Sequence, residues 1–280
     1  NLISVIEPSA FRGLTALKQL YLNLNKLTGL GGAAENAPPL FSELTSLLDL
    51  QLQANRIQAL RNDTFLGLQK LNVLELRFNS IEHIERNAFA PLRSLVQLWL
   101  HFNNLTNALL DTRDTLCKLG ETLKKLEMSG NSFVLLKNNT FDCFKKLNRL
   151  NLASNLIGVI EVNALQGLRA ALTETVLNTN RLARIEPGSF SDLAKVKQIH
   201  LYSNRLSTLH SYTFRGMSGL KDLTLESNDI SRIEECAFCG LTSLESLILD
   251  NNKIETLEEK AFSADLAKLS SLSLSYNSLK

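Results

Sequence analysis

Apolar residues recur along the whole chain in one pattern, Leu-x-x-Leu-x-Leu-x-x-Asn, in which most x positions are polar. The stretch Leu-x-Leu has the period of two that a short strand shows, and a pattern repeated about every 24 residues is typical of a repeat array. We therefore predict one coil per repeat, with a short parallel strand that points its Leu side chains inward. The closing Asn falls at Asn25, Asn55, Asn79, Asn103, Asn131, Asn155, Asn180, Asn204, Asn228, Asn252 and Asn277.

Two residue types obey the repeat and suggest how each coil is built. The Asn fits the turn that follows the strand, because its side-chain amide can bond backbone groups that the turn would leave without partners. We therefore expect a ladder of stacked Asn side chains. Phe fills the back of the coil ten positions after the Asn, and Phe41 takes that place in a longer repeat. The regular positions are Phe11, Phe65, Phe89, Phe141, Phe190, Phe214, Phe238 and Phe262.

The repeats differ in length at two places. Most steps between successive Asn residues are 24 or 25 residues, but one of 30 contains GLGGAAENAPPLF and one of 28 contains NALLDTRDTLCKLG. In a third repeat Thr175 replaces the expected Leu, which predicts a locally irregular coil. We expect a single solenoid domain over residues 1–280, with about 11 repeats of 24–30 residues and a horseshoe curvature.

The motifs LKQLYLNLNKL, LNVLELRFNSI and LVQLWLHFNNL resemble the 24-residue extracellular leucine-rich repeat, and the match covers essentially the whole chain. With its two stretched repeats the array is similar to a Toll-like receptor ectodomain. Lymphocyte-type leucine-rich repeat receptors and Slit-like guidance proteins tend to be more regular. The resemblance implies an α/β-type leucine-rich repeat solenoid with a parallel sheet on its concave face and little regular helix. The Cys-rich caps of such ectodomains are missing, so we expect a fragment.

Charge, composition and the motifs that the sequence lacks argue against several classes of function. With 30 Lys and Arg against 28 Asp and Glu, the net charge of +2 does not by itself imply a polyanionic partner. The sequence has no run of 18 apolar residues and no signal-peptide pattern near its first residue. It also lacks nucleophile-elbow, P-loop, zinc-protease and dinucleotide motifs, so we expect no enzyme, no cofactor and no metal site.

Sequons and cysteines agree with an extracellular class. The sequons begin at Asn62, Asn104 and Asn138. Cys117 and Cys143 occupy nearly the same height on adjacent coils, which makes a disulfide between them feasible. Cys236 and Cys239 enclose the core residue Phe238, which favours a structural disulfide or buried thiols over redox or zinc chemistry.

The non-Leu strand positions should face the inner surface of the solenoid, where side chains are free to vary and to bind ligand. Two adjacent coils concentrate side chains typical of recognition there, including the only Trp. Phe78 and Phe102 could instead be a structural stack over the sheet edge. His101 would gain charge in an acidified compartment if its pKa stays near 6.5. The predicted ligand-binding set is Arg77, Phe78, Trp99, His101, Phe102 and Lys125.

The resemblance implies the ectodomain of an innate immune pattern-recognition receptor that binds a microbial ligand, a nucleic acid or a protein, and forms a homodimer around it. The parent would be a single-pass membrane receptor whose span lies outside this fragment, facing the extracellular space or the endosomal lumen. A nucleic acid would stack on the aromatic faces and would bind more tightly as pH falls. The alternative is an adhesion, guidance or lymphocyte-type receptor that binds a protein on its concave face.

Overall fold

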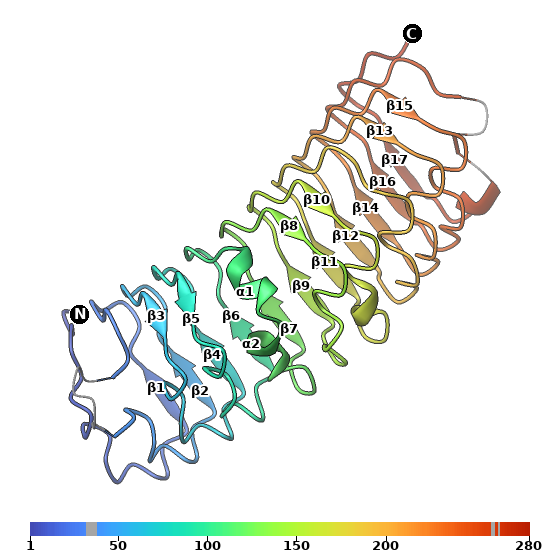
Figure 1. Cartoon of the computed structure of the whole chain (residues 1–280). Helices are drawn as coiled ribbons and strands as arrows, with labels where there is room; N and C mark the ends of the chain where they lie inside the picture. Colours follow the sequence, from blue (N-terminus) through green and yellow to red (C-terminus); the bar gives the residue numbers. More distant parts are fainter. Residues whose placement is uncertain (32–37, 259–260, 263) are drawn as a thin grey trace. The chain divides into compact units, whose positions relative to one another are not determined.

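The computed structural model describes residues 1–31, 38–258, 261–262 and 264–280, drawn in Figure 1. The chain divides into two compact units, Asn1–Ser132 and Phe133–Lys280. The single domain expected from the sequence stays a prediction. Residues 32–37, part of the stretched segment GLGGAAENAPPLF, lie outside the described residues.

Parallel strands, one from each repeat, build a sheet in the first unit. The sheet has the order β1-β2-β4-β6-β7, and the repeats stay in register, with Leu50 beside Leu74 and Leu74 beside Leu98. The short strands β3 (Ala59–Leu60) and β5 (His83–Ile84) pair behind it. The sheet strands are β1 (Gln19–Tyr21), β2 (Asp49–Gln51), β4 (Val73–Glu75), β6 (Gln97–Trp99) and β7 (Lys125–Glu127).

The second unit repeats this plan in the order β9-β11-β12-β14-β16-β17. Two short pairs, β8 (Leu135–Leu136) with β10 (Val159–Ile160) and β13 (Thr208–Leu209) with β15 (Arg232–Ile233), accompany it. Each unit is thus a parallel-strand solenoid, which confirms the predicted fold class. The sheet strands are β9 (Arg149–Asn151), β11 (Glu174–Val176), β12 (Gln198–His200), β14 (Asp222–Thr224), β16 (Ser246–Ile248) and β17 (Ser271–Ser273).

Helix is confined to short pieces within the described residues. The α-helices α1 (Asn107–Asp111) and α2 (Arg113–Cys117) lie in the 28-residue repeat, and η1 (Gln166–Leu168) and η2 (Ala264–Leu266) are single 3-10 turns. Helix α1 begins four residues after its ladder Asn, as β5 does in the preceding coil. The additional residues of the stretched repeat therefore form the two helices on the side of the coil where neighbouring repeats place their short strands (Figure 1).

The Asn ladder is present and spans neighbouring coils. Asn103 Nδ2 donates to the carbonyl oxygens of Leu76 (3.0 Å) and Leu100 (2.9 Å), and Asn103 Oδ1 accepts from the N–H of Ile81 (2.9 Å). One side chain thereby satisfies backbone groups in two coils that would otherwise be buried without partners. Most ladder residues are buried as expected, but Asn79 and Asn277 are only partly buried.

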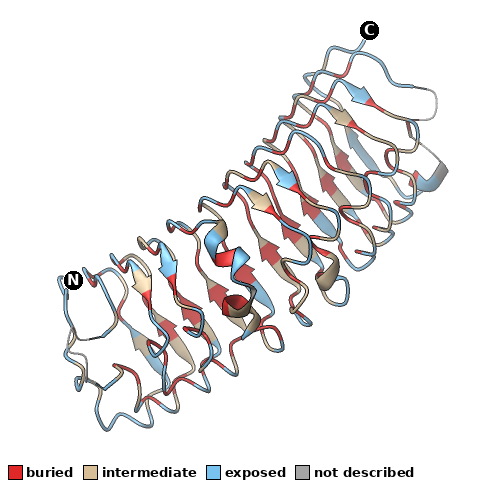
Figure 2. Ribbon diagram, viewed as in Figure 1, coloured by how far each residue is buried: buried red, intermediate tan, exposed pale blue. Residues whose placement is uncertain are grey.

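Leu and Phe form the core of both units. The middle residue of most sheet strands is fully buried, and buried and less buried residues alternate along the strands (Figure 2). The Phe rings stack from coil to coil, with ring centroids 6.1 Å apart for Phe65–Phe89 and 6.2 Å apart for Phe190–Phe214. Phe41 is also fully buried, so it takes the expected place in its long repeat.

The coil of Thr175 is regular, so the prediction of an irregular coil is wrong. Thr175 is fully buried within β11 and lies in register with Leu150 on one side and Ile199 on the other. Its β-branched side chain has nearly the shape of Val and suits a strand. The Thr175 hydroxyl has no hydrogen-bond partner.

Candidate functional site

The residue before each ladder Asn has a left-handed backbone in all eleven repeats, with φ between 53° and 64°. Most coils place small or polar residues there, because this conformation is unfavourable for bulky side chains. Phe78 and Phe102 are exceptions in adjacent coils, each with a φ of 53°. The remaining members of the series are Leu24, Ala54, Gly130, Ser154, Thr179, Ser203, Ser227, Asn251 and Tyr276.

Phe78 and Phe102 stack on each other in spite of this backbone. Their ring centroids lie 4.8 Å apart with an interplanar angle of 6°, and the residues are 51% and 47% exposed. In the next coil, Gly130 occupies the same left-handed position, and a Cβ there would lie 2.4 Å from Phe102 Cδ1. The absence of a side chain at Gly130 therefore leaves room for the Phe102 ring. The stack expected from the sequence is present, and it is open to solvent.

His101 joins the stack to Trp99. Its ring lies edge-on to the rings of Phe78 (5.8 Å), Phe102 (5.7 Å) and Trp99 (5.8 Å). We call Phe78, Trp99, His101 and Phe102 the aromatic cluster. Burial of the His101 ring, and then the nearby Arg77 guanidinium, lower the pKa of His101 to about 4. His101 therefore stays neutral at endosomal pH, and the expectation that it gains charge in an acidified compartment is wrong.

Carboxylates flank Trp99 on the strand face. Trp99 lies in register between Glu75 of β4 and Glu127 of β7, and both carboxylate residues are largely buried. Glu75 also pairs with Arg77, with 3.3 Å between Glu75 Oε2 and Arg77 Nε. Burial raises the pKa of Glu75, although Arg77 opposes this shift. Arg77 therefore has one carboxylate, that of Glu75, as its ion-pair partner.

The structure brings together five of the six residues predicted to bind ligand. Lys125 is the exception, because it begins β7 opposite Gln97, at the other end of the strand from the left-handed position. Arg77 belongs to the group through its ion pair with Glu75 and its influence on the pKa of His101. The site is thus a half-exposed aromatic surface with one cation, Arg77, which is paired with Glu75.

The three sequon residues Asn62, Asn104 and Asn138 are all exposed. Asn62 Oδ1 accepts a hydrogen bond from the N–H of Asn87 (2.8 Å), and Asn104 follows the ladder residue Asn103 directly. Asn104 lies two residues after Phe102 of the aromatic cluster. Glycosylation at these positions stays a prediction.

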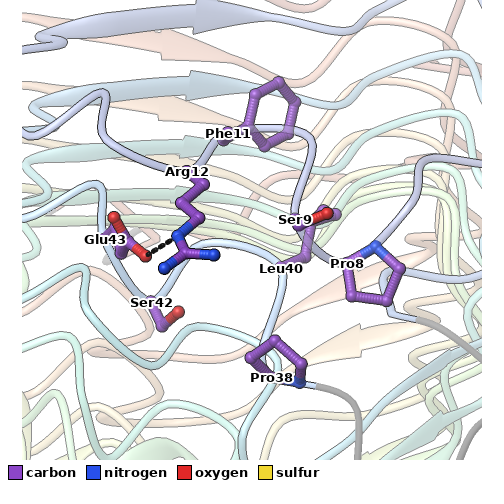
Figure 3. A pocket seen from close by; sticks show the side chains of 8 residues that line it. All are labelled: Pro8, Ser9, Phe11, Arg12, Pro38, Leu40, Ser42 and Glu43. Carbon is purple, nitrogen blue, oxygen red and sulfur yellow. Dashed lines mark ion pairs between the residues drawn. The ribbon is translucent and has the colours of Figure 1, made fainter.

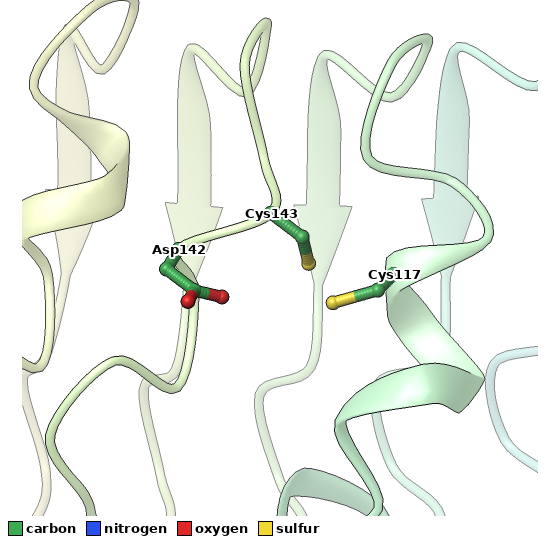
Figure 4. A group of neighbouring side chains, drawn as sticks. All are labelled: Cys117, Asp142 and Cys143. Atoms are coloured by element: carbon green, nitrogen blue, oxygen red, sulfur yellow. The ribbon is translucent and has the colours of Figure 1, made fainter.

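All four cysteines are oxidised. Cys236 is bonded to Cys239, which supports a structural disulfide at the C-x-x-C sequence. Cys117 and Cys143 are both disulfide-bonded, and Figure 4 draws them with Asp142. Metal ions bind cysteine as the thiolate, which a disulfide sulfur does not offer, so we do not propose a metal site at these residues. The pairing of Cys117 with Cys143 stays a prediction.

A small cavity of about 250 Å³ lies near the first coil of the first unit (Figure 3). Phe11, Leu40 and two prolines contribute apolar walls, and Arg12 pairs with Glu43 at 3.9 Å between Nε and Oε1. Nothing in the described structure indicates an occupant, and the cavity lies apart in sequence from the aromatic cluster. We assign it no function.

The repeat architecture and its Asn ladder agree with the sequence comparison. The leucine rich repeat family matches residues 45–105, 170–230, 198–254 and 218–279, which together make up more than half of the chain. The chain belongs to the leucine-rich repeat family.

Several known leucine-rich repeat proteins are similar to this chain in sequence or in fold. Human leucine-rich repeats and immunoglobulin-like domains protein 1 is 30% identical over 197 residues, covering 69% of this chain and 14% of that protein. Toll in its Drosophila complex with Spatzle superposes with a TM-score of 0.74 at 20% identity, covering 99% of this chain and 40% of that one. TLR13 in its complex with ssRNA13 gives 0.61 at 19% identity, covering 100% and 53%. The two structures show the fold alone, and this chain spans only part of each relative.

Sequence reasoning missed two features of this leucine-rich repeat site. The left-handed position and the space at Gly130 explain why two Phe rings can stack in the open. The sequence does contain a sign of the left-handed position, because other coils have small residues there, such as Ala54 and Ser203.

In the described part of the chain, no helix is both long enough and apolar enough to cross a membrane.

Proposed function

We propose that this chain is the ligand-binding segment of a Toll-like leucine-rich repeat receptor, and that it recognises a protein through the aromatic cluster. The observation that carries the proposal is the open stack of Phe78 and Phe102 at a backbone position that disfavours bulky residues. This backbone conformation occurs in all eleven repeats, so the site is distinguished by two exposed rings in adjacent coils and not by the backbone itself. Aromatic side chains are also enriched in protein interfaces, where a few of them carry most of the binding energy.

The charges of the strand face favour a protein over a nucleic acid. In the first unit, Asp49, Glu75 and Glu127 share this face with Arg77 and Lys125. In the second unit, the described face contains Arg149 together with four carboxylate residues, Glu174, Asp222, Glu226 and Asp250. A polyphosphate would approach these carboxylates at a cost, since most of its affinity comes from cations that neutralise phosphate.

Single-stranded nucleic acid remains the second candidate because the cluster offers aromatic faces. Bases stack on such faces with roughly 1–3 kcal/mol each. TLR13, whose fold this chain shares, is seen in complex with an ssRNA. However, Arg77 is paired with Glu75 and His101 stays neutral at endosomal pH, so the cluster provides little charge for phosphate. The protein ligand is therefore the better supported of the two.

The rest of the proposal follows from the receptor class. The parent would be a membrane receptor facing the extracellular space or endosomal lumen, acting in innate immunity by dimerising around its ligand. It would be a binding module and not an enzyme. The similarity to Toll, seen with Spatzle, supports this reading. The similarity to the human leucine-rich repeat and immunoglobulin-like protein supports an adhesion-type receptor, which would also bind a protein.

The decisive experiment removes the stack without disturbing the coil. Phe78→Ser with Phe102→Ser places in two coils the residue that Ser154 and Ser203 already provide at this left-handed position. The control is Tyr212→Ser, because Tyr212 is 48% exposed with a φ of 61° and lies away from the strand face. Wild type and variants are screened against an array of purified secreted proteins and against a single-stranded oligonucleotide.

We expect a secreted protein that binds wild type and the Tyr212 variant but not the double Phe variant. Oligonucleotide binding that is lost only in the double Phe variant would assign the cluster to nucleic acid. Proteins that bind all three forms equally would show that the aromatic cluster is not the recognition surface.

A further inference from the structure

Exposed cations gather on the turns that precede three consecutive strands of the second unit. Lys145 and Lys146 precede β9, Arg169 precedes β11, and Lys195 and Lys197 precede β12. All five side chains are exposed. We call these five residues the basic edge, and it is distinct from the strand face that carries the carboxylates.

Backbone hydrogen bonds align the three turns. Thr173 N–H donates to the carbonyl of Asn148, and Lys197 N–H donates to the carbonyl of Thr173, both at 2.8 Å. Lys195 Nζ reaches back to the carbonyl of Ala170 in the preceding coil at 2.7 Å. Because neighbouring parallel strands are about 4.8 Å apart, the cations of three coils lie along a line of about 10 Å that runs across the coils.

The charges of the basic edge are not neutralised by ion pairs. In the described residues none of its five side chains lies within ion-pair distance of a carboxylate, whereas Lys221 in the next coil pairs with Glu245 at 2.6 Å. The carboxylates on the same turns are Asp142 and Asp192. The edge therefore keeps a net positive charge although the whole chain is nearly neutral.

We propose that the basic edge binds a sulfated glycosaminoglycan, laid across the coils so that successive sulfate groups meet successive turns. A linear polyanion suits a row of unpaired cations because each contact releases a counterion. A polysaccharide fits better than single-stranded nucleic acid, which requires aromatic platforms for its bases. In these coils Phe141, Phe144 and Phe190 are buried in the core.

The compartment also fits this ligand. The disulfide between Cys236 and Cys239 belongs to an oxidising environment, where sulfated polysaccharides are found. The inference does not depend on the aromatic cluster, which lies in the first unit. A polysaccharide at the basic edge would leave the strand face free for a protein ligand.

The test measures heparin binding to wild type and to two variants with the same change in net charge. Lys195→Glu with Lys197→Glu reverses two charges of the basic edge. The control, Arg181→Glu with Arg205→Glu, reverses two exposed cations that directly follow the ladder residues Asn180 and Asn204. Thermal unfolding of each variant checks that it is folded. Unsulfated heparosan and a single-stranded oligonucleotide of matched charge complete the set of ligands.

We expect wild type to bind heparin but not heparosan, with an affinity that falls as salt rises. The edge variant should bind heparin at least about tenfold more weakly, while the control changes by no more than about twofold. The proposal is overturned if wild type does not bind heparin, if both variants lose affinity equally, or if the oligonucleotide binds more tightly than heparin.

Discussion

The rings of Phe78 and Phe102 lie 4.8 Å apart and nearly parallel, although both residues have the left-handed backbone that bulky side chains avoid. An aromatic pair of this kind contributes about 0.5–1.5 kcal/mol beyond its buried area. The left-handed conformation costs about 1–2 kcal/mol at each residue. Residues such as Ser203 have the same backbone in other coils and pay the same cost, so the stack itself contributes only the smaller amount, and we interpret the exposed rings as a recognition surface.

Replacing Phe102 by Ser should lower stability only slightly while it removes ligand binding. The variant loses the ring contact, but it places a smaller polar residue at a position that Ser occupies in several other coils. We expect the free energy of unfolding to fall by about 0.5–1.5 kcal/mol, the contribution of the ring pair. Chemical denaturation measures this value. A loss of several kcal/mol would show that the stack is a structural element of the coil.

Replacing Gly130 by Ala should disturb the site through Phe102. The new Cβ would lie 2.4 Å from Phe102 Cδ1, so the ring must move, and Ala is also strained at a φ of 64°. We expect a cost of about 1–2 kcal/mol from the backbone, with a further cost from the displaced ring. In a Phe102→Ser background only the backbone cost should remain. Equal costs in both backgrounds would contradict the contact between Gly130 and Phe102.

Sequence alone predicted the coil, the Asn ladder, the Phe core and most of the site. The coil, the ladder and the Phe core follow from side-chain types that recur at fixed spacing, with Asn at eleven positions and Phe at nine. The rest depends on contacts between coils. The lowered pKa of His101 arises from its burial and its position near Arg77. The basic edge could not be recognised from the net charge, because carboxylates elsewhere in the chain balance its positive charge.

Cys117 and Cys143 should be linked in protein secreted by eukaryotic cells. Both are disulfide-bonded, and Cys236 and Cys239 are bonded to each other. An unreduced protease digest analysed by mass spectrometry should contain one peptide pair joined through Cys117 and Cys143. Recovery of both residues as free thiols, or of either one joined to a different cysteine, would reject the pairing.

Replacing Thr175 by Val should stabilise the second unit. The two side chains have nearly the same shape, and the Thr175 hydroxyl is buried between β9 and β12 without a hydrogen-bond partner. A buried polar group without a partner costs about 1–3 kcal/mol, so we expect a gain within or just below this range. Chemical denaturation measures the difference. Thr175→Ser is the control, because it keeps the hydroxyl and removes a methyl group, and it should destabilise the protein.

Acidification should destabilise the protein through His101. The pKa of His101 is lowered from 6.5 to about 4 by burial and by Arg77. Between these two values the unfolded chain binds a proton that the folded chain does not, so stability falls as pH decreases from 6.5 towards 4. Glu75 acts in the opposite direction, because its raised pKa favours proton uptake in the folded state.

The comparison with His101→Gln isolates the histidine from these other groups. Thermal unfolding midpoints are measured for wild type and His101→Gln from pH 7 to pH 4, and wild type should lose more stability than the variant. An NMR titration of the imidazole should give a midpoint far below 6.5. If the imidazole instead titrates near its ordinary value, His101 would be charged at endosomal pH. The cluster would then hold a second cation beside Arg77, which would strengthen the case for a nucleic acid ligand.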